Sequence, residues 1–321
     1  MKKIISSITL FSSFLVLGQI NLIEINSYSD LNGTKLVSLT SDNSLWTSNG
    51  LDAWTQINTT ELPKNIEIKK LGSKSNLNLN ESKTDLILIL EDNSIWNLED
   101  GISKWVKLQT TNLPNDVKIK NFKTYAKYNG FFDFETRLVL VLEDNSIWWS
   151  DGETAWEKII NTGLPQNYSI TAFNTYQKPS MFGTETRLII TLSDNSFWWF
   201  ETDEENWRKI ETKNYPKEMF ILHTDAYMKA SIGSIEGRII SVFNDNSIMW
   251  MAVKDSNWIK LESTELPKDI KITKMNVYSK LNMIGKGTRV ILLLENNELW
   301  GWLAEKQSWE KINTSGIPIS N

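Results

Sequence analysis

The stretch T-R-L-V-L-V-L-E-D-N-S-I-W-W, residues 136–149, decides the fold of this chain. Its first seven residues are a short apolar run of β-formers, and E-D-N-S separates them from a second run that begins I-W-W. Asp and Asn tolerate the positive φ angles that tight hairpin turns need, so D-N between two apolar runs predicts a β-hairpin. No segment has a convincing 3.6-residue period, so we expect almost no helix.

The hairpin belongs to a repeat that runs through the whole chain. Six of the seven prolines are spaced by 51 residues: Pro63, Pro114, Pro165, Pro216, Pro267 and Pro318. A tryptophan series has the same spacing: Trp54, Trp105, Trp156, Trp207, Trp258 and Trp309. We interpret this tryptophan series as packing between repeats, because every repeat retains it. The chain therefore contains six repeats.

The sequence pattern of each repeat predicts four strands. The hairpin supplies two, a third carries the periodic tryptophan, as at residues 156–160, and a fourth follows the proline, as at residues 117–125. Four strands in a repeat of roughly 40 to 50 residues are typical of a propeller blade. We predict an all-β, six-bladed β-propeller of four-stranded blades, formed as a single domain by residues 20–321.

The two ends of the chain predict how the ring closes. The sixth repeat stops at Asn321, three residues after Pro318, where its next strand should begin. The N-terminal residues Ile20, Leu22, Ile25 and Tyr28 match Ile270, Ile272, Met275 and Tyr278 in relative position. We therefore expect the last blade to be closed by the N-terminal strand, paired with residues 288–294, 298–303 and 309–313. Such closure would remove an open sheet edge.

The first 19 residues predict export. Lys2 and Lys3 precede an apolar run over residues 4–17, followed by Gly18 and Gln19, which is typical of a secretory signal peptide. The run is too short and serine-rich for a membrane span. We expect a soluble protein, periplasmic or extracellular after signal-peptide removal, and a monomer.

Composition excludes several classes of site. The 321 residues include 34 basic and 39 acidic side chains, a formal net charge of −5, so no broad positive field favours nucleic acid. There is no cysteine and one histidine, which excludes disulfides, thiolate metal ligands and multi-histidine zinc sites. We therefore expect no metal and no cofactor. His223 stands in an ordinary strand, and we expect no catalytic residue.

The candidate ligand-binding residues form three series. An arginine opens the apolar strand in four repeats: Arg137, Arg187, Arg238 and Arg289. A glutamate lies two residues earlier, on the same face of an extended strand, in three of them: Glu135, Glu185 and Glu236. A second aromatic follows the hairpin tryptophan at Trp149, Trp199 and Trp250. Guanidinium, carboxylate and aromatic faces together suit a sugar ring. The alternatives are a salt-bridge belt for the charged series and core packing for the tryptophans.

The loop of residues 127–135 is the most divergent among the repeats. It carries Phe131, Phe132 and Phe134, which predict either an exposed contact patch or a cover over the ring face.

The repeat resembles those of several propeller families. I-K-I-x-K, R-L-V-L-V-L-E-D-N-S-I-W-W, W-E-K-I and L-P are similar to repeats of the tectonin, tachylectin and RCC1 types, although the RCC1 glycines and histidine are missing. Blade number and an arginine before a hairpin also resemble fucose-binding six-bladed lectins, whose sugar-contacting glutamate has no clear match here. That resemblance implies sugar binding only at the four arginines. S-D-N-S-F-W is similar to the aspartate box of sialidases but lacks its glycine and its Asp spacing.

The sequence thus predicts an exported, non-catalytic, tryptophan-rich binding protein. Glycan recognition is the first interpretation. A protein-interaction scaffold is the alternative, and a sialidase-like glycoside hydrolase the third.

Overall fold

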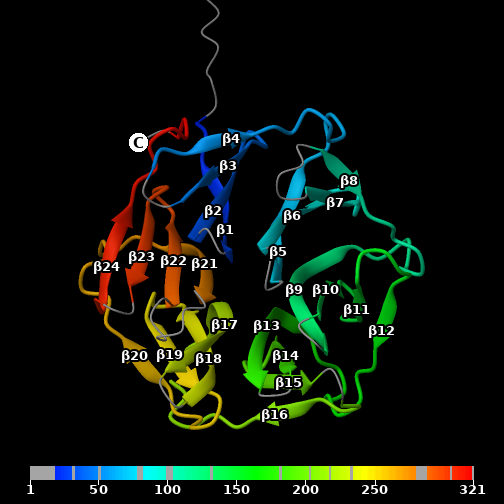
Figure 1. Ribbon diagram of the computed structural model, residues 1–321. Helices are drawn as coiled ribbons and strands as arrows, with labels where there is room; N and C mark the ends of the chain where they lie inside the picture. Colours follow the sequence, from blue (N-terminus) through cyan, green and yellow to red (C-terminus); the bar gives the residue numbers. More distant parts are fainter. Residues whose placement is uncertain are drawn as a thin grey trace, which may run out of the picture.

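The computed structural model describes residues 19–30, 33–49, 52–77, 82–98, 104–130, 133–180, 183–201, 204–216, 218–231, 234–279, 288–303 and 306–319. These residues form 24 strands and no helix, arranged as six four-stranded sheets. Figure 1 shows the six sheets radiating around a common axis. The predicted six-bladed β-propeller is therefore confirmed. In the described part of the chain, no helix has the length and apolarity to cross a membrane.

Each blade is a run of four consecutive strands. The first three blades contain β1 (Leu22–Asp30), β2 (Gly33–Thr40), β3 (Leu45–Ser48), β4 (Thr55–Ile57); β5 (Ile68–Leu77), β6 (Ser82–Leu90), β7 (Ile95–Leu98), β8 (Trp105–Lys107); and β9 (Ile119–Gly130), β10 (Asp133–Leu142), β11 (Ile147–Ser150), β12 (Glu157–Ile159). The last three contain β13 (Ile170–Ser180), β14 (Gly183–Leu192), β15 (Phe197–Glu201), β16 (Arg208–Ile210); β17 (Ile221–Ser231), β18 (Ser234–Phe243), β19 (Ile248–Ala252), β20 (Ile259–Leu261); and β21 (Ile272–Ser279), β22 (Thr288–Leu294), β23 (Leu299–Leu303), β24 (Ser308–Ile312).

The first strand of each blade surrounds the axis, and the fourth lies at the rim (Figure 1). The predicted hairpin joins the second and third strands: in blade 3, Val141 pairs with Ile147 and Leu138 with Ser150. The side chains of the second strand are buried on both faces, because each blade packs against a neighbour on either side. This explains why these strands are continuous apolar runs rather than alternating ones.

The D-N-S turns connect neighbouring blades as well as neighbouring strands. Asp144 accepts hydrogen bonds from the Ser146 amide (2.9 Å) and hydroxyl (2.6 Å), while Asn145 adopts φ 64°. The Asn145 side-chain oxygen accepts a hydrogen bond from the amide of Ile170, the first residue of the next blade (2.9 Å). Equivalent bonds run from Ile68, Ile119, Ile221, Ile272 and Leu22 to Asn43, Asn93, Asn195, Asn246 and Asn297. The asparagine of the turn therefore couples the blades around the ring.

The periodic tryptophans are buried between blades, which confirms their interpretation as packing residues. All six are at most 6% exposed. The indole N–H of Trp156 donates to the carbonyl of Gln109 in the preceding repeat (2.9 Å), and Trp105, Trp207 and Trp309 donate to carbonyls at the same 47-residue separation. Five of the six side chains thus combine apolar burial with a hydrogen bond to the neighbouring blade; the exception is Trp258, whose indole N–H is buried without such a partner.

The predicted closure of the last blade by the N-terminal strand is wrong. The N-terminal strand β1 pairs with β2 in blade 1, from Leu22 opposite Thr40 to Asp30 opposite Gly33. The last blade contains its own first strand, β21, paired with β22. The match between residues 20–28 and 270–278 is real, but it means that both segments open a blade. Pairing with the adjacent strand closes a two-residue link, which costs far less chain entropy than pairing across the molecule.

The ring is instead closed by the segment that follows β24. The indole N–H of Trp54 donates to the Asn313 carbonyl and its backbone N–H to the Ser315 carbonyl, both at 2.8 Å. Ile317 packs in the same buried cluster as Trp54 and Leu22. The end of the chain therefore packs on blade 1, in the place where the preceding repeat packs on each of the other blades.

Two sequence predictions fall beyond the described part of the molecule. Residues 1–18 of the predicted signal peptide lie outside the described residues, and so do Phe131, Phe132 and the side chain of Phe134.

Candidate ligand-binding site

Three of the predicted arginines meet three of the predicted tryptophans. In blade 3, Arg137 lies on the same face of β10 as Val139, and Val139 pairs with Trp149 of β11. This diagonal relation between adjacent strands puts the guanidinium carbon of Arg137 3.7 Å from the Trp149 ring centroid. The corresponding distances are 4.2 Å for Arg187 and Trp199, and 3.8 Å for Arg238 and Trp250. Such cation–π contacts contribute about 0.5–2 kcal/mol each, more when desolvated.

A tyrosine opposes each of these arginines on the innermost strand. The cross-strand pairs are Tyr125 and Arg137, Tyr176 and Arg187, Tyr227 and Arg238, and Tyr278 and Arg289. The Arg187 guanidinium donates to the Tyr176 hydroxyl at 3.4 Å. Burial raises the pKa of the Tyr227 hydroxyl, and its hydrogen bond with Arg238 opposes that rise. Our sequence analysis missed these tyrosines as site residues, although their own 51-residue spacing is a signal that could have found them.

Carboxylates hold two of the stacked arginines in orientation. The Nε of Arg238 donates to Glu236 at 2.5 Å, and an amino group of Arg187 lies 3.6 Å from Glu201. Glu201 was not among the predicted residues; it follows the hairpin and pairs with Arg187 across β14 and β15. Arg238 and Arg187 are only 13% and 22% exposed, so these ion pairs are screened less than surface pairs. These ion pairs therefore hold both guanidinium groups over their tryptophan rings.

The remaining predicted residues do not join a described cluster. Arg289 occupies the equivalent register, but Gly301 stands where the other blades have the second tryptophan. A side chain at Gly301 would meet Ile312 and Ile291 at 3.3 and 3.6 Å. The side chains of Glu135 and Glu185 lie outside the described residues.

Trp250 also lines a pocket of about 350 Å³ at the outer part of blade 5. Its lining consists of Lys213, Trp250, Ala252, Lys254, Asp255, Asn257 and Ile259. Trp250 pairs with Ile259 on β20, whose side chain is 47% exposed, so the two supply adjoining apolar surface. Of the predicted site residues, Trp250 is therefore placed at a cavity, while the polar residues beside it were not predicted.

The polar wall of the Trp250 pocket is held by contacts between two segments. The Lys213 amide donates to the Ser256 carbonyl at 2.6 Å, and the Asn214 side chain donates to the Asn257 side-chain oxygen at 3.3 Å. Asn257 in turn donates to the Asp255 carbonyl at 3.2 Å, and Ser256 adopts φ 62°. An indole, an aliphatic side chain, an amide, a carboxylate and two ammonium groups thus converge on one concave surface. Such a surface can accept a ligand with both apolar faces and hydroxyl groups.

No group of three or more His, Asp or Glu side chains in the described part of the chain is arranged to hold a metal ion. His223 lies on β17, and burial lowers the pKa of its imidazole.

Comparison with known proteins identifies similar folds only. No protein-family model matches the chain, and no curated protein matches its sequence. The structure is similar to a mutant of Aleuria aurantia lectin in complex with Fucalpha1-6GlcNAc, with TM-score 0.59 and 14% identity over 92% of this chain and 97% of the lectin. It is also similar to a mutant of AofleA from Arthrobotrys oligospora, with TM-score 0.61 and 11% identity over 92% of this chain and 90% of that chain. At these identities the likeness concerns the propeller fold alone.

Proposed function

We propose that this chain is a non-catalytic propeller that recognises glycans, with the pocket at Trp250 as its principal site. The observation that carries the proposal is the composition of that pocket. Trp250 and Ile259 offer apolar surface for the C–H face of a sugar ring, while Asp255 and Asn257 offer acceptors and donors for hydroxyl groups. Its volume of about 350 Å³ lies within the range of small-molecule sites. The fold shared with lectins that bind fucose-containing ligands supports the same function.

The repeated Arg–Trp stacks extend the proposal to further blades. Trp149 and Trp199 carry the same arginine contact as Trp250, so they would form related sites of different affinity. Trp199 has a second cation, Arg208, 5.2 Å from its ring centroid, which leaves less of its surface for a ligand. We therefore expect the Trp250 site to bind more tightly than the Trp199 site.

A glycan array with the purified full chain tests this function, followed by titration of the best ligand into variants. Asn257→Ala should weaken binding by about tenfold, because it removes hydrogen bonds to the sugar and two hydrogen bonds that hold the pocket wall, without touching the core. Asn206→Ala is the matched control, since Asn206 is exposed and precedes Trp207 as Asn257 precedes Trp258. Trp250→Ala should abolish binding at this site.

Three results would refute the proposal in different ways. If no glycan binds while a defined protein co-purifies with the chain, the protein-scaffold alternative replaces it. Release of free sugar from a bound glycan would indicate the hydrolase alternative instead. Equal binding by Asn257→Ala and Asn206→Ala would mean that sugars bind elsewhere.

The role of the arginines needs a separate comparison. Arg238→Ala removes the guanidinium from Trp250, whereas Arg289→Ala makes the same change in the blade where Gly301 replaces the tryptophan. A ligand-binding role predicts that only Arg238→Ala weakens sugar binding, with a modest fall in melting temperature from the lost contacts with Trp250 and Glu236. A large fall in melting temperature without loss of affinity would favour the salt-bridge belt.

We further propose that the chain is exported and that residues 1–19 are removed as a signal peptide. The support is the sequence Lys2-Lys3 followed by the apolar run to residue 17. N-terminal sequencing of the protein from culture supernatant and periplasm should find a chain that begins near Ile20. Retention of Met1 in a cell-bound product would contradict this.

A further inference from the structure

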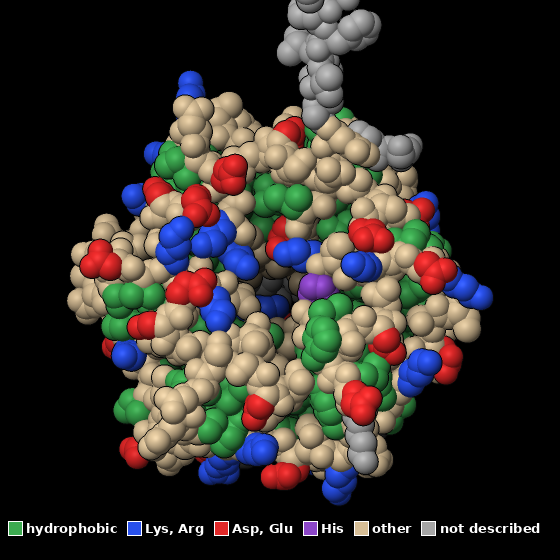
Figure 2. All heavy atoms as spheres, turned by 180° about the vertical axis from the view of Figure 1, so that it is seen from behind, with side chains coloured by type: hydrophobic (Ala, Val, Ile, Leu, Met, Phe, Trp, Pro, Cys, Tyr) green, Lys and Arg blue, Asp and Glu red, His purple; other side chains and the backbone are tan. Residues whose placement is uncertain are grey.

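The axis of the propeller contains a polar cavity of about 300 Å³. It is lined only by residues of the six innermost strands, so it is separate from the Trp250 pocket at the outer part of blade 5. Figure 2 shows a hollow at the centre of one face, with basic side chains gathered beside it. Five charged side chains line the cavity: Glu24, Lys70, Lys123, Asp225 and Lys274.

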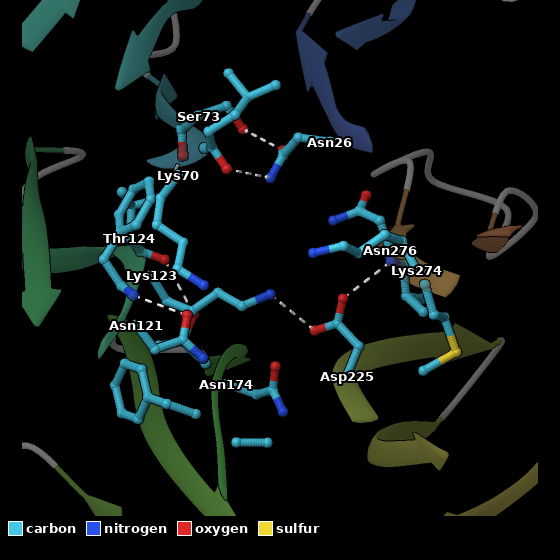
Figure 3. Close-up of a pocket in the computed structure, with 18 of the residues that line it drawn as sticks. Asn26, Lys70, Ser73, Asn121, Lys123, Thr124, Asn174, Asp225, Lys274 and Asn276 are labelled. Atoms are coloured by element: carbon cyan, nitrogen blue, oxygen red, sulfur yellow. Dashed lines mark hydrogen bonds and ion pairs between the residues drawn. The ribbon is translucent and has the colours of Figure 1, made fainter. Parts of the chain in front are cut away.

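Both carboxylates of the cavity already have cationic partners. Glu24 lies 2.9 Å from the Lys274 ammonium, and Asp225 lies 3.2 Å from the Lys123 ammonium. The second oxygen of Asp225 accepts a hydrogen bond from the Val277 amide at 3.0 Å. Figure 3 shows the contacts of Asp225 crossing between strands of different blades. Both carboxylates are therefore already paired. The cavity is lined by three lysines, so one ammonium group has no carboxylate partner.

Lys70 supplies that unpaired ammonium group. Among the described residues, no acceptor or carboxylate lies within hydrogen-bond or ion-pair distance of the Lys70 ammonium. Burial lowers the pKa of Lys70, with the nearby charge of Glu24 opposing this. A partly buried ammonium that has lost water without gaining an anionic partner is destabilising, so the site favours any anion small enough to enter. Figure 3 shows Lys70 and Lys123 projecting from neighbouring strands into the cavity.

Amide side chains add neutral donors around the same space. Asn26 donates one amide hydrogen to the Leu71 carbonyl (3.4 Å), and Asn174 donates one to the Thr224 carbonyl (3.2 Å). Because a primary amide has two N–H donors, each can still offer one to a ligand. Asn121 and Asn276 also line the cavity. An oxyanion with several acceptor oxygens would satisfy these donors and the Lys70 ammonium together.

We propose that the axial cavity is a binding site for a small oxyanion, a carboxylate or inorganic phosphate, held by Lys70 and the surrounding asparagines. The innermost strand of every blade contributes residues to the lining of this site. The site is independent of the proposed glycan pocket, and either can fail without the other.

Isothermal titration of the full chain at pH 7, in Tris chloride, tests the site with sodium phosphate and sodium acetate as separate ligands. We expect one anion per chain. Lys70→Gln should weaken binding at least about tenfold, since a charged hydrogen bond is lost. Lys69→Gln is the matched control, because it removes the same charge from the adjacent residue, which does not line the cavity. It should bind within twofold of the parent.

Two further variants keep the test decisive if Lys70→Gln fails to fold. Lys70→Arg retains the charge and should retain binding, while Glu24→Gln removes the competing carboxylate and should tighten it. Binding of phosphate alone, acetate alone or both identifies the oxyanion class. The proposal is overturned if neither anion binds, if Lys70→Gln binds like Lys69→Gln, or if Glu24→Gln weakens binding.

Discussion

At the scale of single residues, the asparagine of the D-N-S turn has three functions. Asn145 occupies a left-handed backbone conformation with φ 64°, which most residues with a Cβ adopt at a cost of about 1–2 kcal/mol. Its side-chain oxygen accepts from Ile170, and its amide donates to the Tyr168 carbonyl at 3.3 Å. One residue thus shapes the hairpin and attaches the next blade at two points.

Two substitutions at Asn145 separate these functions. Asn145→Gly keeps the backbone conformation but loses both side-chain hydrogen bonds, and should lower the free energy of unfolding by about 1–3 kcal/mol. Asn145→Ala adds the strain of positive φ and should lose about 1 kcal/mol more. Denaturant unfolding of the two variants and the parent measures both values. Equal stability of the Gly and Ala variants would show that the turn relaxes.

The partly buried His223 predicts a pH dependence of stability. Burial lowers the pKa of His223 and the adjacent Lys274 lowers it further, while a hydrogen bond with the Ile272 backbone and the charge of Glu24 act in the opposite direction. The unfolded chain therefore binds the proton more readily, so stability should fall as the pH drops through about 6.5, the ordinary histidine value. Melting temperatures between pH 5 and 7.5 should show this fall in the parent and less of it in His223→Gln. If the melting temperatures of the parent and of His223→Gln fall equally with pH, other groups cause the pH dependence.

At the scale of elements, the turn before each periodic proline joins one blade to the next. Gly163 has φ 93°, and a Cβ there would lie 2.4 Å from the backbone oxygen of Trp207 in the following blade. Gly316 stands in the same relation to Trp54. These two linkers pass so close to the neighbouring strand that no side chain fits between them.

Gly163→Ala should therefore be strongly destabilising, by roughly 2 kcal/mol or more, because both the φ angle and the contact are violated. Gly152→Ala is a control with nearly the same φ of 96°, where the nearest atom to a Cβ is a Leu138 methyl at 4.0 Å. It should cost only the conformational strain. The difference between the urea unfolding midpoints of the two variants measures the cost of the contact with the Trp207 backbone. A difference near zero would refute this close contact.

At the scale of the whole molecule, the C-terminal segment makes the chain a ring. Its carbonyls accept from Trp54, and Ile317 is 6% exposed in the cluster that joins the last blade to the first. Blades 3 and 4 obtain equivalent contacts from continuous chain, where the amides of Trp156 and Trp207 donate to the carbonyls of Thr111 and Thr162. The contact between the last and first blades is therefore the one that involves the chain ends.

Removing residues 314–321 should destabilise the protein by about 2–4 kcal/mol, from lost burial of Ile317 and a lost hydrogen bond to the Trp54 amide. Ile317→Ala should produce part of this loss, whereas Pro318→Ala, at an exposed position, should have little effect. Thermal unfolding compares the three variants. If the truncated chain melts like the parent, the segment does not close the ring.

Much of the molecule was determined by the sequence itself. The 51-residue period of proline and tryptophan, with D-N turns between apolar runs, specifies strands, hairpins and the number of blades, because each of these signals acts over a few residues. The Arg–Trp contacts were also foreseeable, since Arg137 and Trp149 lie on adjacent strands of one hairpin.

Only the tertiary structure decided how the ends meet and where the cavities lie. Residues 20–28 resemble the first strand of every blade, so local pattern alone could not show which neighbouring strand they join. The Trp250 pocket depends on Lys213 reaching Ser256 across 43 residues of chain, and the axial cavity depends on lysines from three different blades. Such sites arise from contacts between distant segments, and their geometry exists only once the ring has closed.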